Sequence, residues 1–209
     1  DLLGFFTGLE EVSIRTQATA TFDDRVIGFD APEGENAMIL PFAMYYQIWR
    51  ACNDPDYTPG PGDCPKGGCT DIYTYAGGQV KSGADGYPEM KLYPNKAGTC
   101  CLPSAPGNFG TVDIGPGNNS TADLKRQIVE GVRPDELAMV GNFILTDEDG
   151  DGVPTLWVEA DTGVSDSVKS SFEQILGEAR CIPLFRDLTG NGNNARYEIC
   201  GFAGVRIWT

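Results

Sequence analysis

The residues from Gly107 to Val132 read G-N-F-G-T-V-D-I-G-P-G-N-N-S-T-A-D-L-K-R-Q-I-V-E-G-V. The short apolar run at Phe109, Val112 and Ile114 predicts a strand. The Gly-Pro-Gly-Asn-Asn segment that follows it has the residues of a turn. A strand that leads through a turn into a helix is therefore the unit around which we expect the fold to be organised.

The second half of this stretch has the features of a capped helix. Leu124, Ile128 and Val132 recur every four residues, so they form one apolar stripe along a helix. Residues 118–121, Asn-Asn-Ser-Thr, are of the types that cap a helix N-terminus, and Asp123 in the first turn suits the helix dipole. These letters are better explained as a turn and a cap than as a ligand site.

Helical and strand patterns interleave along the rest of the chain. Helices are predicted over residues 41–52, 134–140 and 164–177. Strands are predicted over residues 12–22, 70–75, 89–93, 142–146, 155–160, 180–185 and 195–208. The last two strands flank a turn and should pair as a hairpin. The pattern predicts an α+β fold with a mainly antiparallel β-sheet and about three to four packed helices.

Length and composition favour a single domain over residues 1–209. The chain has 209 residues, of which 41% are hydrophobic, and 27 glycines. This composition suits one core with many turns. Residues 53–106 are rich in glycine, proline and cysteine, and we interpret them as a loop-rich insertion within that domain. No apolar run approaches the ~18 residues of a membrane span.

Charge and the lack of histidine argue against several classes of function. The net charge of −15 repels phosphate backbones and anionic lipids, so nucleic acid and membrane surfaces are poor partners. The chain has no histidine, so it lacks the commonest general base and the usual nitrogen ligand of zinc. An enzyme would have to work through carboxylates, lysine, tyrosine or metal-bound water.

Two of the seven cysteines lie in the C-terminal hairpin. Cys181 and Cys200 are equally far from a turn centred on Gly190 and Asn191, so a symmetrical hairpin would place them opposite each other. Opposed residues on neighbouring strands have Cβ spacings that a disulfide can bridge. We expect a Cys181–Cys200 disulfide, and two buried thiols are the alternative.

The other cysteines lie in or beside the loop-rich insertion. They are Cys52, Cys64, Cys69, Cys100 and Cys101. Their spacings do not match a zinc ribbon, which favours disulfides that staple the loop. Because their number is odd, one thiol is left over or pairs outside the chain. The spacings do not decide which of the five cysteines pair with each other. Disulfides persist in oxidising compartments, so we expect an extracellular or cell-surface protein.

Asp147, Asp149 and Asp151, followed by a glycine, match the first half of a calcium-binding loop. Oxygen ligands at every second position converge on an ion when the glycine lets the chain turn. The second half departs from an EF-hand, because Val158 stands where that loop has its glutamate and Glu159 comes one residue later. We expect a structural Ca²⁺ held by these aspartates and Glu159, with a solvated acidic turn as the alternative.

Besides the opening stretch, several segments carry a resemblance to a known family. Residues 160–177 read A-D-T-G-V-S-D-S-V-K-S-S-F-E-Q-I-L-G, and residues 192–207 read G-N-N-A-R-Y-E-I-C-G-F-A-G-V-R-I. Together with V-S-I-R-T-Q-A-T-A-T-F at 12–22, they resemble the extracellular C-terminal region of TadG-like proteins of planctomycete-type bacteria, which are associated with tight-adherence (Flp) pilus assembly. The resemblance covers nearly the whole chain.

This resemblance implies a structural protein of the cell surface without catalytic residues. Family members have an N-terminal membrane helix and further sequence ahead of this region, so we expect this chain to be a processed form that is released or assembled. The cysteines and the acidic loop at 147–152 look like additions to the family pattern.

The sequence also indicates how copies of the chain would associate, and it leaves a second class of function open. The predicted strand over 12–22 is suited to pairing with another copy, so we expect a homo-oligomer or filament formed by N-terminal strand exchange. The alternative function is a secreted carbohydrate-binding or carboxylate-dependent hydrolytic domain.

Overall fold

A computed structural model of the chain describes its central and C-terminal parts. The described residues are 26–29, 31, 34–60, 69–89, 110–117, 120–160, 166–190 and 194–207. Several predictions lie outside them: the strand over 12–22, the cysteines at 64, 100 and 101, Phe109, and the start of the helix predicted from residue 164.

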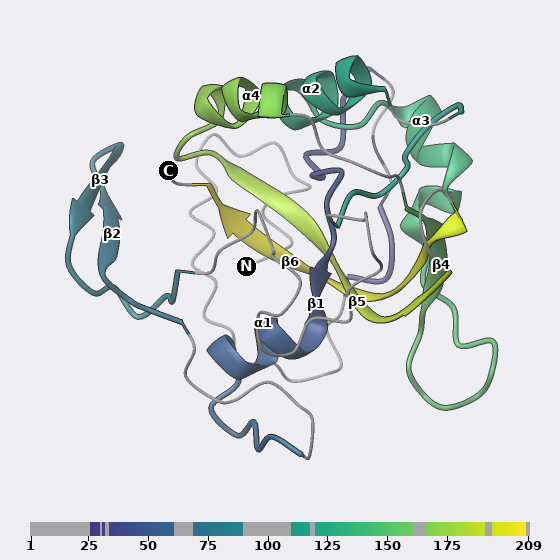
Figure 1. Cartoon of the computed structure of the whole chain (residues 1–209), viewed down its shortest axis with the longest axis horizontal. Coiled ribbons are helices and arrows are strands. Elements are labelled where there is room, and N and C mark those ends of the chain that lie inside the picture. The colour runs from purple at the N-terminus through teal and green to yellow at the C-terminus, as the bar shows by residue number, and fades with distance from the viewer. Residues whose placement is uncertain are drawn as a thin grey trace.

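The largest element is a long antiparallel hairpin made of β5 (Ala179–Thr189) and β6 (Arg196–Arg206). β4 (Leu156–Glu159) pairs antiparallel with β6, and the two-residue β1 (Met44–Tyr45) pairs parallel with β5. The sheet therefore has the order β1-β5-β6-β4 and is mainly antiparallel (Figure 1). This confirms the predicted C-terminal hairpin and the α+β class.

Helices cover this sheet on two sides. α2 (Thr121–Glu130) lies against α4 (Lys169–Gln174), which follows the short 3-10 helix η3 (Asp166–Val168). α3 (Pro134–Met139) leads into a second 3-10 helix, η2 (Gly141–Phe143). α1 (Tyr46–Asn53) directly follows β1, and its Tyr46 and Trp49 pack against the same apolar cluster as Leu124 of α2. Within the part of the chain that the structure describes, no helix is both long and apolar enough to cross a membrane.

Two apolar clusters form the core on either side of the hairpin. One includes Ile39, Val112, Ile114, Phe143, Leu145 and Ile199. The other includes Leu40, Leu124, Ile128, Val168, Ile175 and Ile182. Full burial of a side chain of this size contributes about 1.5–3 kcal/mol. Both clusters contain residues of the stretch from Gly107 to Val132, so this stretch contributes to both halves of the core.

The helix of the opening stretch is formed with its predicted start, but it ends at Glu130, so Val132 lies outside it and bridges to Ala37. Ser120 is its N-cap: the Ser120 Oγ accepts a hydrogen bond from the Asp123 backbone N–H, and the Asp123 carboxylate accepts one from the Ser120 N–H. Leu124 and Ile128 are buried. Reciprocal bonds of this kind satisfy the N–H groups that a helix start leaves without partners. Cap and stripe together therefore fix where α2 begins and which face it buries.

The prediction of a strand ahead of this helix, at Val112 and Ile114, is wrong. Thr111 and Val112 make only isolated bridges, to Phe42 and Ala160 respectively. Gly110 and Gly115 on either side have positive φ angles of 86° and 126°. The backbone therefore turns at both ends, and the extended segment between them is too short to form a ladder.

Two further boundaries were set by tertiary contacts and not by local pattern. The helix predicted from residue 41 begins at Tyr46, because residues 42–45 pair with Thr111 and with β5. The strand predicted over 142–146 is not formed: Asn142 and Phe143 belong to the 3-10 helix η2 and have φ angles of 54° and 49°, which a strand does not allow. Thr146 alone retains a bridge, to Thr155.

The helix predicted over 164–177 is shorter than expected, and its last apolar residue is not buried. η3 and α4 cover residues 166–174, after which the chain turns. Ile175 is buried, whereas Leu176 is 41% exposed. Gly177 follows with a φ of 81°, so it ends the helical segment as a C-terminal glycine usually does.

The strand predicted over 70–75 is formed over its second half, and an isolated bridge joins Thr70 to Glu89. The rest of the strand predicted over 89–93 lies outside the described residues. β2 (Tyr73–Ala76) and β3 (Gln79–Ser82) pair antiparallel and form a separate two-stranded sheet. The turn between them is Gly77-Gly78, with φ angles of 63° and 76°. Two glycines with positive φ are typical of the two-residue hairpin turn. We call residues 69–89 the ribbon; it lies to one side of the main sheet (Figure 1).

Candidate functional site

The three aspartates predicted to bind calcium lie together at the tip of a loop. Thr146 and Thr155 exchange backbone hydrogen bonds and close this loop at its base. Asp147, Asp149 and Asp151 are exposed, and one carboxylate oxygen of each lies within 4.8 Å of the others. We call residues 147–153 the Asp loop. The structure thus brings together three of the four predicted ligands.

Glu159 is not part of this group. It lies in β4, where the register pairs it with Arg196 of β6. A strand between the loop and Glu159 carries that carboxylate away from the tip. The predicted four-residue ligand set is therefore reduced to the three aspartates.

The Asp loop is shaped by hydrogen bonds between its own carboxylates and backbone. Asp147 accepts from the Gly152 N–H at 3.1 Å, and Asp149 accepts from the Asp151 N–H at 3.2 Å. Asp151 in turn accepts from the Val153 N–H at 2.8 Å. Such side-chain to backbone bonds hold aspartate-rich turns closed without any ion.

A cation from the sheet reaches into this loop, and no sequence pattern predicted it. Arg186 of β5 donates from Nη1 to Asp151 at 2.8 Å, and its guanidinium lies 3.8 Å from Asp149. The same guanidinium binds Glu198 of β6 in a bidentate pair, at 2.8 and 3.0 Å. Glu198 is buried. Arg186 therefore links the loop tip to the centre of the β5–β6 hairpin.

This arrangement sets the charge state of the loop. The pKa of Asp151 is lowered, first because its carboxylate accepts a hydrogen bond from Arg186 and second because it accepts one from the Val153 N–H. The pKa of Arg186 is raised, chiefly by its hydrogen bond to Glu198. Both groups are therefore charged near neutral pH.

The Asp loop fits a calcium ion only in part. Calcium takes six to eight oxygen ligands, of which the three aspartates would supply a few and backbone carbonyls and water the rest. The guanidinium of Arg186 already neutralises part of the charge that would attract the ion. A bound Ca²⁺ would therefore have to compete with Arg186 for Asp151 and Asp149.

The predicted disulfide between Cys181 and Cys200 is not formed. Cys181 lies opposite Gly204, and the ladder shifts between the Leu184–Gly201 and Phe185–Ile199 pairs, which places Cys200 at the bulge. The hairpin is therefore not symmetrical about Gly190, as the prediction assumed. Burial raises the pKa of the Cys181 thiol to about 12, so this thiol stays protonated.

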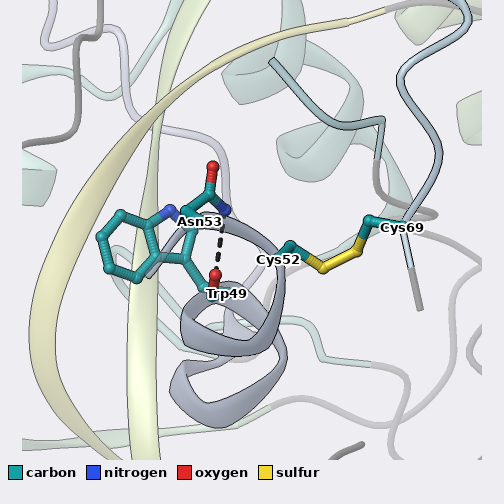
Figure 2. Close-up of a disulfide and its surroundings, with 4 residues drawn as sticks. All are labelled: Trp49, Cys52, Asn53 and Cys69. Carbon is teal, nitrogen blue, oxygen red and sulfur yellow. Dashed lines mark hydrogen bonds between the residues drawn. A yellow bond between two sulfur atoms is a disulfide. The ribbon is translucent and has the colours of Figure 1, made fainter. Parts of the chain in front are cut away.

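The disulfide that is formed joins Cys52 to Cys69, with the two Cα atoms 5.6 Å apart (Figure 2). Cys52 lies in the last turn of α1, which is held by the bond from the Asn53 side-chain amide to the Trp49 carbonyl at 2.9 Å. Cys69 is the first residue of the ribbon. The prediction of a stapled loop is confirmed for this pair, and the staple ties the ribbon to α1.

The ribbon has a second attachment to the body of the protein. The guanidinium of Arg206 lies over the Tyr75 ring, 4.5 Å from its centre. A Cβ built on Gly177 would come within 3.2 Å of the same ring, so Tyr75 also packs against this glycine. Cation–π contact and packing together hold the turn end of β2 against the end of β6.

The rest of the ribbon is exposed and apolar. Ile72, Tyr73, Val80 and Tyr87 are between 40% and 52% exposed. The carboxylate of Glu89 accepts hydrogen bonds from the backbone N–H groups of Ile72 and Tyr73. The Gly-Gly turn signalled this hairpin in the sequence, but nothing in the local pattern showed that its side chains would stay uncovered by the described residues.

Comparison of the chain with protein-family models, with curated proteins and with solved structures gives no match.

Proposed function

We propose that the chain is a non-enzymatic structural protein of the extracellular or cell-surface compartment, related to TadG-like pilus-assembly proteins, that associates with further copies of itself. The observation that carries this proposal is the ribbon, which a disulfide and Tyr75 hold in place while its apolar side chains face solvent. Exposed apolar groups on a fixed element are typical of a surface that meets another protein.

The Cys52–Cys69 disulfide supports the proposed extracellular or cell-surface location. Cys52–Cys69 closes a loop between two parts of the chain that are 17 residues apart. Structural disulfides form and persist in oxidising environments and are rare in the cytosol. The acidic net charge of −15 is compatible with the same setting, because it keeps an extracellular protein soluble.

The buried charged groups support a structural role over a catalytic one. Arg180 donates to the Ile128 and Val129 carbonyls at the end of α2, at 3.4 and 3.2 Å. Arg126 pairs with the buried Glu136, which in turn accepts from a backbone N–H at the start of α3. Each of these groups joins one element to another, so its charge is committed to holding the fold.

Self-association is tested by sedimentation velocity of the purified chain over a wide concentration range, together with electron microscopy. We expect species larger than the monomer, and regular polymers at high concentration. The same preparation on a glycan array tests the alternative of a carbohydrate-binding or hydrolytic domain. A chain that stays monomeric at every concentration and binds glycans would overturn the proposal.

We propose a structural role for calcium at the Asp loop, with release of Asp151 and Asp149 from Arg186 when the ion binds. Ca²⁺ should then raise the melting temperature of the chain, and a chelator should reverse the rise. The Arg186→Gln variant should show the larger rise, because calcium no longer has to displace a guanidinium. Asp149→Asn should show little or none. An unchanged melting temperature in both the wild type and Arg186→Gln would rule out the ion.

A further inference from the structure

We propose that β3 is the contact through which two copies of this chain meet: β3 of one copy pairs antiparallel with β3 of a second copy. This inference rests on the proposed function, that the chain self-associates, and it assigns the surface. The geometry points to β3 for three reasons: its open edge, the apolar face it would extend, and its charge.

The first reason is the open edge. β3 pairs with β2 on one side, with Thr74 opposite Lys81 and Tyr75 opposite Val80. On the other side, no described residue forms a ladder with β3, and its four residues are all exposed. An edge strand presents backbone N–H and C=O groups to any further strand, and a two-stranded ribbon alone is marginally stable. A strand from a second copy would meet both needs.

The second reason is the face that pairing would extend. Alternate residues of a strand share a face, and opposed residues of a ladder lie on the same face. Tyr73, Tyr75 and Val80 therefore line one face of the ribbon. Val80 is 44% exposed at the β3 side of this face. A second β3 would continue the face and cover Val80 with the same residue of the partner copy.

The third reason is charge. The chain carries −15 overall, so two copies repel each other over most of their surfaces. β2 reads Y-T-Y-A and β3 reads Q-V-K-S, so the two strands hold no carboxylate and one lysine. Two copies can therefore approach through these strands with little of the repulsion that the rest of the chain generates. This argument favours a second acidic copy as the partner.

Two-fold symmetry fixes the register. In a symmetrical antiparallel pair each face must meet the same face of the partner, so the axis passes beside Val80 or beside Lys81. The Lys81 register would place two ammonium groups directly opposite each other, which is destabilising. The remaining register places Val80 opposite Val80 of the second copy and Gln79 opposite Lys81 of the second copy. Four-residue strands bury little area, so the contact should be weak.

The experiment uses charge swaps in the full chain. Val80→Glu places a carboxylate opposite its own copy at the axis and should weaken association about tenfold or more. Val80→Lys should do the same. An equimolar mixture of the V80E and V80K chains should recover association, because the introduced charges are then opposite. Met139→Glu is the matched control, since Met139 is an exposed apolar residue of α3, 58% accessible, and far from the ribbon in sequence.

Sedimentation velocity of the four chains and the mixture distinguishes the outcomes. The β3 pair is supported if association is weakened in V80E and in V80K, is unchanged in M139E, and is restored in the mixture of V80E and V80K. If the wild type associates and V80E associates equally well, the β3 contact is overturned while the proposed function stands. If each charge variant is weakened and their mixture is not restored, the two-fold register is overturned. A wild type that never associates overturns both proposals.

Discussion

At the scale of single residues, Arg186 joins carboxylates from two distant parts of the chain. Its guanidinium binds Glu198 across the β5–β6 pair and Asp151 at the tip of the Asp loop. Because Glu198 is buried, loss of Arg186 would leave this carboxylate poorly solvated and without its counter-charge. Solvent screening moderates the effect, since the Arg186 side chain is 27% exposed.

We expect Arg186→Gln to lower the free energy of unfolding by about 1–3 kcal/mol, because the glutamine cannot supply the bidentate bond to Glu198. Urea denaturation near neutral pH measures this change. Arg196→Gln is the matched control on the neighbouring strand; Arg196 is exposed, and we expect an effect within about 0.5 kcal/mol. Equal losses in the two variants would contradict a specific role for Arg186.

The lowered pKa of Asp151 predicts a pH dependence. A carboxyl whose pKa is lower in the folded state than its ordinary value of 3.8 stabilises the fold above that pH, and the stabilisation is lost as the pH falls through the folded-state pKa. Asp151→Asn should therefore have a lower urea midpoint than the wild type at neutral pH. The difference should shrink and vanish as the pH falls below 3.8.

Urea titrations at several pH values test this prediction. The control is Asp56→Asn, because Asp56 is an exposed aspartate outside the loop, and this variant should match the wild type throughout. A difference between Asp151→Asn and the wild type that stays constant down to low pH would show that the effect does not come from the charge of Asp151.

At the scale of elements, sequence reasoning succeeded where a local signal and the tertiary contacts agree. α2 has its cap at Ser120 and its stripe at Leu124 and Ile128, and the fold uses both. The β5–β6 hairpin has apolar runs on both sides of a turn, so its existence was also predictable. Its register was not, because Thr189 pairs with Arg196, so the turn is not centred on Gly190 and Asn191, and a bulge near Phe185 also interrupts the ladder.

The candidate site likewise has features that the sequence predicts and features that only the tertiary structure reveals. The spacing of Asp147, Asp149 and Asp151 predicted a loop that gathers carboxylates, and local backbone geometry delivers it. Arg186 enters from a strand 35 residues further along the chain, so only the tertiary structure reveals it. The exposed ribbon was missed for a related reason: Gly77-Gly78 indicates a hairpin, but exposure depends on what the rest of the fold leaves uncovered.

The Cys52–Cys69 disulfide should hold the ribbon on α1. A double variant, Cys52→Ala with Cys69→Ala, should lose about 2–4 kcal/mol of unfolding free energy, as expected for a loop of this length. The ribbon should also become more sensitive to limited proteolysis, because the contact of Tyr75 with Arg206 would still hold it to β6 but the covalent link to α1 would be gone. Cys181→Ala is the control, since Cys181 is not in a disulfide.

Mass spectrometry separates the bonded cysteines from the thiols. Alkylation of the denatured chain without reductant should label Cys181 and Cys200 and leave Cys52 and Cys69 unlabelled. Labelling of Cys52 and Cys69 together, or a peptide that links Cys181 to Cys200, would contradict the assignment.

At the scale of the whole molecule, the β3 pair alone is not enough to build a filament. A two-fold pair through β3 uses the same surface on both copies, so it closes on itself as a dimer. Growth beyond a dimer needs a second, different contact. The strand predicted over 12–22 is the other element of this chain with the pattern for pairing between copies.

These two contacts make separable predictions. A chain that lacks residues 1–22 should stop at the dimer, because β3 pairing remains and strand exchange is lost. The full-length Val80→Glu chain should keep the contact made by strand exchange but lose the β3 pair, so it should form chains or rings of a different mass per length. The variant with both changes should sediment as a monomer. Multi-angle light scattering and electron microscopy of the four proteins measure these states. If the truncated chain forms polymers that look like those of the wild type, the strand over 12–22 is not the second contact.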